Sequence, residues 1–263
     1  MKDPQATREL NLLAHALDAH LERAAQRGTR RVPMPVPTAA PPAAAAAPTR
    51  RPPAPKPVAA PQGDPRTASP TAPLAAAAPD LASLQSTVAA CEACGLCRTR
   101  TQTVFSDGTG SARVLFIGEA PGQDEDEQGV PFVGRSGALL TDIIEKGMKL
   151  RREEVYIANV LKCRPPGNRD PETAEKELCT PFLDRQIELL DPQLLITLGL
   201  HASRHILKST SSLARMRGRV HQLGGRKVIA TYHPAFLLRS PHMKKDCWQD
   251  IQMAMAELGL PRS

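Results

Sequence analysis

Side chains that could carry out chemistry follow three short apolar segments of the sequence. Glu119 follows "RVLFIG", Asn159 ends "VYIAN", and His233 follows "KVIATY". A fixed amide offers a hydrogen-bond donor and an acceptor, an imidazole exchanges protons near neutral pH, and a carboxylate can hold water. If the apolar segments are parallel strands, the three side chains meet at the carboxyl ends of a sheet, where α/β proteins bind ligands. The pattern predicts a binding site on this rim.

Cysteine forms the second group of residues with chemical potential. The six cysteines begin with a C-x-x-C pair and continue downstream: Cys91, Cys94, Cys97, Cys163, Cys179 and Cys247. A C-x-x-C pair with two distant cysteines suits a tetrahedral zinc ion or an iron–sulfur cluster, and spacing alone does not choose between them. Unrelated buried thiols are the alternative interpretation.

The elements that must position these groups alternate between strand and helix. Four short apolar runs have the character of strands buried on both faces: Arg113–Gly118, Val155–Leu161, Gln193–Leu198 and Lys227–Thr231. Helical patterns lie between and after them, at about Gly137–Lys149, Pro171–Leu190, Ala202–Lys208 and Lys245–Leu258. We therefore expect an α/β fold, a three-layer sandwich with a central four-stranded parallel sheet flanked by helices.

The composition divides the chain into three parts. Residues 1–30 contain an apolar stripe of leucines at helical spacing, which predicts an isolated amphipathic helix. Residues 31–80 are mostly Ala, Pro and Thr, and 15 of the chain's 26 prolines fall between Val32 and Pro79, so we expect a disordered Ala/Pro-rich linker. Residues 81–260 are long enough to form one buried core. The N-terminal helix is expected either to dock on an unidentified protein or to remain solvated.

Charge and hydropathy limit the classes of function. The net charge of +7 permits binding to a polyanion without requiring it. No segment approaches the roughly 20 apolar residues of a membrane span, and the acidic N-terminus resembles neither a signal peptide nor a transit peptide. We expect a cytoplasmic protein with no membrane partner. Disulfides are disfavoured in that compartment, so the cysteines are expected to be free or bound to metal.

Four motifs together resemble one enzyme family. They are "GEAPGQDEDEQGVPFVGRSG", "YIANVLKC", "LKCRPPGNRDP" and "YHPAFLLR". In type and order they resemble the family 4 uracil-DNA glycosylases, the iron–sulfur branch of the uracil-DNA glycosylase superfamily, over residues 81–260. The resemblance implies a monomeric DNA-repair hydrolase that flips uracil out of single- or double-stranded DNA and leaves an abasic site. Two alternatives remain: the branch that cross-links to its abasic product, which resembles "GEQPG", and a non-catalytic zinc-bound nucleic-acid-binding module.

The resemblance also implies a cofactor. The family holds a [4Fe–4S] cluster on four cysteines, and the matching positions are Cys91, Cys94, Cys163 and Cys179. Cys97 has no required counterpart, and Cys247 is expected to be a packed thiol of the last helix. The implied role of the cluster is structural.

Roles in substrate binding carry over from the same motifs. Glu119 and Ala120 are expected to lie against the base, and Phe132 to stack on it. Asn159 is expected to read the N3–H and O4 of uracil, and His233 to donate to O2 during catalysis.

The remaining implied roles concern water and DNA. Glu125 matches the proposed water-activating carboxylate of the family. Arg217 and Arg239 are expected to contact DNA, and Leu237, or its neighbour Leu238, to fill the gap left by the flipped base.

Overall fold

The fold is built on a six-stranded mixed sheet. The computed structural model describes residues 69–261. Its strands are β1 (Asp107–Gly108), β2 (Val114–Gly118), β3 (Tyr156–Asn159), β4 (Leu194–Leu198), β5 (Val220–Leu223) and β6 (Arg226–Thr231). They lie in the order β1-β3-β2-β4-β6-β5, and the central four are parallel.

The expected four-stranded sheet was too small, because two edge strands were missed. β1 pairs antiparallel with β3, and β5 pairs antiparallel with β6. β1 is two residues long and contains a glycine, and β5 is only partly buried, so neither presents the continuous apolar run that marked the central strands. The four predicted strands are the parallel centre of the sheet.

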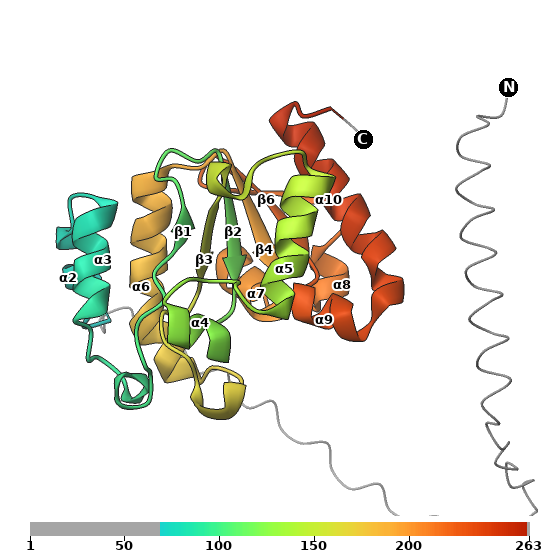
Figure 1. Cartoon of the computed structure of the whole chain (residues 1–263). Helices are drawn as coiled ribbons and strands as arrows, with labels where there is room; N and C mark the ends of the chain where they lie inside the picture. The colour runs from blue at the N-terminus through green and yellow to red at the C-terminus, as the bar shows by residue number, and fades with distance from the viewer. Residues whose placement is uncertain (1–68, 262–263) are drawn as a thin grey trace, which may run out of the picture. The chain divides into compact units, whose positions relative to one another are not determined.

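Helices cover both faces of the sheet (Figure 1). The α-helices are α2 (Ala72–Ala77), α3 (Leu81–Ala89), α4 (Gln123–Gln128), α5 (Arg135–Asp142), α6 (Thr173–Leu190), α7 (Leu200–Leu207), α8 (Leu213–Met216), α9 (Pro234–Arg239) and α10 (Lys244–Leu258). A π-helical turn, η2 (Ile143–Gly147), continues α5. Short 3-10 turns are η1 (Gly95–Arg98), η3 (Arg152–Glu154), η4 (Pro166–Asn168) and η5 (Pro241–Met243). None of the helices within residues 69–261 combines the length and apolar character that a bilayer crossing needs.

Alternate residues of the central strands enter two separate cores. Phe116 and Ile196 pack on the side of α5 and α10, whereas Leu115 and Leu195 pack on the side of α6 and α7. All four side chains are fully buried. Because successive side chains of a strand point to opposite faces, strands buried on both faces require helices on both sides. The expected three-layer sandwich is therefore confirmed.

The folded region begins before the expected boundary at residue 81. Helix α2 falls within the range assigned to the linker, and it packs against α3 and α6. The Thr71 hydroxyl donates to the Leu178 carbonyl at 2.7 Å, and the Arg185 guanidinium donates to the Ala78 carbonyl at 2.8 Å. The burial of Ala75 and Ala78 was not predicted, because the Pro-rich composition of this segment favoured a disordered linker. The predicted helix at residues 1–30 and the linker up to residue 68 lie outside the described residues.

Candidate active site and cysteine site

A cavity of about 440 Å³ lies at the carboxyl ends of β2, β3 and β6. Its lining includes most of the predicted site residues: Glu119, Ala120, Glu125, Phe132, Asn159, His233 and Arg239. These residues come from segments more than 100 positions apart in the sequence. The convergence on one rim that the strand pattern predicted is therefore present in the structure.

Asn159, the last residue of β3, places a buried amide at this cavity. Its side chain is 2% exposed, and its Oδ1 atom has no hydrogen-bond partner among residues 69–261. Gly118 lies beside it, and a Cβ atom there would be 2.2 Å from Asn159 Oδ1 and 2.6 Å from the Phe132 ring. Only glycine allows the amide and the ring to approach so closely. A buried acceptor without a donor is costly, which marks Asn159 as a group suited to a ligand.

His233 follows β6 and caps the start of α9. Its Nδ1 atom accepts a hydrogen bond from the Ala235 backbone N–H at 3.1 Å. Burial, aided by the nearby Arg239 guanidinium, lowers the pKa of His233 to about 4. The imidazole is therefore neutral near pH 7, with Nδ1 as acceptor and the proton on Nε2. His233 thus offers the cavity one neutral N–H donor.

Phe132 is held in an unusual backbone conformation next to this histidine. Its φ angle is 56°, in the left-handed region that bulky residues rarely adopt. The Phe132 ring lies 5.5 Å from the His233 ring between centroids, at an interplanar angle of 31°. Gly137 permits this arrangement, because a Cβ atom there would be 1.9 Å from the Phe132 carbonyl oxygen. Backbone strain of this kind is typical of functional sites.

The Glu125 carboxylate holds the acidic loop together. Oε2 accepts from the Gly122 N–H at 3.0 Å, and Oε1 accepts from the N–H groups of Val133 and Gly134 at 3.0 and 3.1 Å. A carboxylate has about four acceptor positions, so these three bonds leave one of them for a further donor. The neighbouring Asp126 is also an anchor, since both of its oxygens accept from the Thr101 N–H. Sequence reasoning did not detect these anchoring roles.

The Glu119 carboxylate is held less tightly than the Glu125 carboxylate, which accepts three backbone hydrogen bonds. Its side chain is 28% exposed, and His201 Nε2 lies 3.8 Å from Glu119 Oε1. Burial raises the pKa of Glu119, and the nearby Asp170 carboxylate raises it further although His201 opposes the shift. One ligand atom from each of Glu119, Asp170 and His201 lies within 4.8 Å of the others. Asp170 lies in the segment between β3 and α6, and His201 lies in the first turn of α7, directly after β4. Their positions after two parallel strands were the sequence signal for this group.

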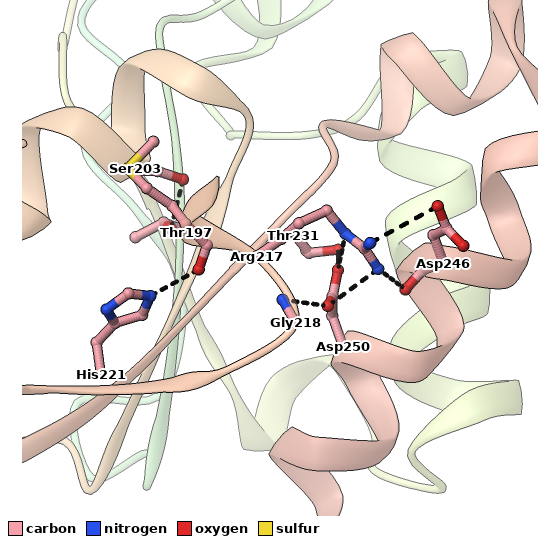
Figure 2. Close-up of polar contacts among 9 residues, drawn as sticks. Thr197, Ser203, Arg217, Gly218, His221, Thr231, Asp246 and Asp250 are labelled. Carbon is pink, nitrogen blue, oxygen red and sulfur yellow. Dashed lines mark hydrogen bonds and ion pairs between the residues drawn. The ribbon is translucent and has the colours of Figure 1, made fainter. Parts of the chain in front are cut away.

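Two residues that were predicted to contact DNA make contacts within the protein: Arg217 is partly buried and Leu237 is buried. Arg217 Nε donates to Asp250 Oδ2 at 2.9 Å (Figure 2). The central carbon of the guanidinium lies 5.2 Å from the centre of the Tyr232 ring. Asp250 is fully buried and also accepts from the Thr231 hydroxyl at 2.8 Å. Basic sequence context did not reveal this partner, which lies 33 residues away. Arg217 is therefore held by an ion pair within the protein, and its contact with DNA stays a prediction.

The two leucines offered as the wedge differ in burial. Leu237 is 1% exposed and belongs to the core beneath α9, whereas Leu238 is 37% exposed. Helical geometry separates the two neighbours onto different faces. Arg239, at the end of α9, lines the cavity.

Five cysteines line a second cavity. They are Cys91, Cys94, Cys97, Cys163 and Cys179. All six cysteines are free thiols, and Cys247 is buried in α10, as expected. Burial raises the pKa of Cys179 to about 12 and also raises the pKa of Cys94 and of Cys163. The thiolate forms that bind metals are unfavourable in such a cavity unless a metal supplies positive charge.

The spacing of the sulfurs bears on which metal group fits. Within residues 69–261, no three cysteine Sγ atoms lie within 4.8 Å of one another. Four thiolates around one tetrahedral zinc ion, each about 2.3 Å from the metal, lie only about 3.8 Å apart. Among the described residues, the sulfurs are therefore not gathered as closely as around one bound zinc ion.

Two cations border the cysteine cavity. Arg100 Nη1 donates to Cys163 Sγ at 3.3 Å and to the Cys91 carbonyl at 2.8 Å. Lys162 is 1% exposed, and its backbone N–H donates to Cys179 Sγ at 3.2 Å. Burial lowers the pKa of Lys162 to about 8. The cavity therefore combines thiols with the positive charges that would accompany a negatively charged metal–thiolate group.

Comparisons with known proteins place the chain in a family. The model of the uracil DNA glycosylase superfamily matches residues 105–252. A type-4 uracil-DNA glycosylase from Sulfurisphaera tokodaii is 41% identical over 180 residues, which cover 65% of this chain and 82% of the relative. One from Thermotoga maritima is 43% identical over 168 residues, which cover 62% of this chain and 87% of the relative.

A more distant likeness separates the type-4 family from another branch. A type-5 uracil-DNA glycosylase from Pyrobaculum aerophilum is 30% identical over 141 residues, which cover 48% of this chain and 62% of the relative. The type-4 relatives are more similar and cover more of both chains. The resemblance that the motifs indicated is confirmed, and the chain belongs to the type-4 family of the uracil-DNA glycosylase superfamily.

Proposed function

We propose that the chain removes uracil from DNA by hydrolysing the bond between N1 of the base and C1′ of deoxyribose, and so begins base excision repair. Membership in the type-4 family supports this activity. The single observation that carries the proposal is the buried Asn159 amide, which lines the cavity with an Oδ1 atom that lacks a donor among the described residues. Uracil brings a donor and an acceptor side by side on its Watson–Crick edge.

Asn159 would choose the base. Its Oδ1 accepts from uracil N3–H while its Nδ2 donates to O4. Cytosine presents an acceptor at N3 and a donor at N4, so the same amide would face it with two mismatched pairs. In a dry site each mismatch leaves a buried polar group unpaired, and such sites reject the wrong ligand strongly.

Phe132 would hold the base after it leaves the helix. A base in duplex DNA must rotate out of the stack before its glycosidic bond is accessible. The cavity volume of about 440 Å³ lies within the range of small-molecule sites. Stacking of a base on an aromatic ring contributes about 1–3 kcal/mol, which offsets part of the cost of unstacking.

His233 would stabilise the departing base. Cleavage of the bond leaves negative charge on the uracil ring and positive charge on the sugar. A neutral imidazole with its proton on Nε2 donates to uracil O2 as that charge develops, and Nδ1 is already held by the Ala235 N–H. A donor fixed in advance costs no reorganisation during the reaction.

A carboxylate would hold the attacking water and favour the sugar cation. Glu125 has one acceptor position left after its three backbone bonds, so it can hold water at a fixed place. Glu119 lines the same cavity and is more exposed. We assign the water to Glu125 because its position is fixed, and the contact with the base to Glu119 and Ala120.

DNA would be held along the rim of the cavity. Arg239 lines the cavity wall and is placed to contact a phosphate next to the flipped nucleotide. Leu238, the exposed neighbour of the buried Leu237, would fill the gap in the stack. Wedges of this kind reduce the cost of holding the duplex open.

The cysteine cavity would hold a [4Fe–4S] cluster on Cys91, Cys94, Cys163 and Cys179. Four thiolates are the usual ligands of such a cluster, and all four of these cysteines line one cavity. When bound, the cluster supplies structural cross-linking between the segment after α3, the loop after β3 and helix α6. Cys97 lines the same cavity without being assigned as a ligand.

The activity is tested with oligonucleotides that carry one uracil, thymine or cytosine at the same position. Incubation followed by alkali should break only the uracil strand, because alkali cleaves at abasic sites. His233→Ala, which lacks the neutral donor to uracil O2, is the comparison variant: it should break the uracil strand more slowly and still leave the other two strands intact. Equal breakage of all three strands would contradict the proposal, and so would the absence of breakage with a folded, brown protein. A colourless and inactive protein would favour a zinc-bound nucleic-acid-binding module.

A further inference from the structure

Lys162 occupies a position that the proposed mechanism does not use. It lies three residues after Asn159 and directly before Cys163. Its side chain is among the most buried in the protein, with 1% exposure. Burying an ammonium group costs several kcal/mol unless other groups compensate for its charge. A lysine at this place therefore needs a physical reason.

The first part of the reason is the contact with Asn159. Lys162 Nζ donates to the Asn159 backbone carbonyl at 2.8 Å. The edge strand β1 pairs only with Tyr156 and Ile157, so it ends before it reaches Asn159. The lysine side chain takes over as donor where the neighbouring strand stops. The end of β3, and with it the Asn159 amide, is held by this ammonium group.

The second part is the group of partners that holds the ammonium itself. Lys162 Nζ also donates to Gln186 Oε1 at 2.5 Å, and it lies 5.9 Å from the centre of the Phe105 ring. The Gln186 amide in turn donates to the Tyr156 hydroxyl and to the Phe105 carbonyl. Among the described residues, none of these hydrogen-bond partners is a carboxylate, so the positive charge is not balanced by an acid.

The cysteine site is the remaining source of negative charge. The Lys162 backbone N–H donates to Cys179 Sγ, and the next residue, Cys163, lines the same cavity. Four thiolates around an iron–sulfur cluster give a group with net negative charge. The same residue therefore touches the cysteine site with its backbone and the base-reading strand with its side chain.

We propose that Lys162 is a positioning residue that couples the occupied cysteine site to base recognition by fixing the backbone of Asn159. The proposal rests on the proposed function, because it needs Asn159 to read uracil. It gives the cysteine site a role beyond stability: the negative charge of the site holds the ammonium group, and the ammonium group holds the amide in register with the base.

The test is a double-mutant cycle between Lys162→Met and Asn159→Ala. Lys162→Met keeps the length and apolar character of the stem and removes the donor. Small displacements of a positioning group cost up to about 10²-fold in rate, so we expect kcat/KM for uracil excision to fall roughly tenfold or more. If Lys162 acts through Asn159, the same change in an Asn159→Ala background should cost less than about twofold, because coupled sites are not additive.

His233→Ala provides the contrasting background. His233 follows β6 and caps α9, whereas Lys162 holds the end of β3, so Lys162→Met should retain its full effect there. Lys227→Met, at the opposite end of the sheet in an ion pair with Glu257, is the matched lysine control and should leave excision unchanged. Iron content per chain, visible colour and the dissociation constant of free uracil are measured on every variant. We expect full iron and weaker uracil binding for Lys162→Met.

Each outcome decides the matter. An equal loss from Lys162→Met in the wild-type and Asn159→Ala backgrounds would overturn the proposal, and so would a loss of iron that accounts for the fall in activity. If Lys162→Met does not fold, Gln186→Leu replaces it, since this change frees the ammonium from its second acceptor and should show the same dependence on Asn159. An inactive wild-type protein would instead reject the proposed function, so the two failures are distinguishable.

Discussion

Replacement of Asn159 by aspartate changes one group of the cavity while preserving its shape. The carboxylate of Asn159→Asp still accepts from N3–H of uracil, but it no longer donates to O4. Because the side chain at this position is 2% exposed, water cannot replace the lost donor. The variant therefore exchanges an attractive contact for an acceptor facing an acceptor.

The size of the effect follows from this burial. Loss of the donor to O4 costs about 1–1.5 kcal/mol, and an unpaired buried acceptor adds about 1–3 kcal/mol, more when it is charged. A total of about 4 kcal/mol corresponds to a loss of roughly 10³-fold in kcat/KM. The N4 amino group of cytosine can donate a hydrogen bond to this carboxylate, so trace excision of cytosine is expected.

The assay is single-turnover excision on matched uracil and cytosine oligonucleotides between pH 5 and 8. Burial favours the protonated form of the introduced carboxyl group, and that form has an O–H that can donate to O4. Uracil excision by Asn159→Asp should therefore recover partly as the pH falls, which the wild type should not show. His233→Ala should slow uracil removal at every pH and leave the preference for uracil unchanged. Wild-type rates for Asn159→Asp would refute the assignment of base reading to this residue.

Four further predictions follow from the structure. Replacement of Cys91, Cys94, Cys163 or Cys179 by Ala should bleach the protein and lower its soluble yield, whereas Cys97→Ala should remain brown; the reverse result for Cys97 and Cys94 would refute the ligand assignment. The pKa of His233 is lowered from 6.5 to about 4, so His233 favours the folded state above pH 6.5 and that contribution is lost as the pH falls through about 4. Excision should likewise fail near pH 4 through protonation of His233, and an acid limb centred near pH 6.5 in the kcat/KM profile would contradict the neutral donor. Leu238→Ala should slow excision from duplex DNA more than from single strands with unchanged stability, whereas Leu237→Ala should cost about 2–5 kcal/mol in urea unfolding; equal effects of the two would reject the wedge. A chain that begins at Ser69 should keep full activity. A chain that begins at Leu81 lacks the Thr71 hydrogen bond and the buried Ala75 and Ala78, so its free energy of unfolding should fall by about 2 kcal/mol. Equal stability of the two chains would show that α2 contributes nothing.

The parallel centre of the sheet and the rim of the cavity could be predicted from local patterns. Strands buried on both faces have continuous apolar runs, and their carboxyl ends meet by geometry, so Asn159 and His233 could be placed together. The edge strand β5 escaped detection because its burial is partial and its partner is set by tertiary structure. The ion pair of Arg217 escaped prediction for a similar reason, since a basic loop gives no sign of a buried aspartate on a distant helix.

The anchoring roles in the acidic loop were also beyond local reasoning. Glu125 is held by backbone donors eight and nine residues away, and this can be seen only after the loop has closed. The positive φ angle of Phe132 is similarly a product of the close approach of α5 at Gly137. Side-chain types indicated the chemistry of the cavity, whereas tertiary contacts determine which oxygen or ring is free to perform it.

The most direct test of the account is to count free uracil and abasic sites in the same reaction. The wild-type protein and an oligonucleotide with one uracil should yield the two products in equal amounts. Asn159→Asp, folded and with full iron, should yield almost none at pH 8. Abasic sites without free uracil, or equal product from the wild type and this variant, would contradict the claim that the cavity reads and releases uracil through Asn159.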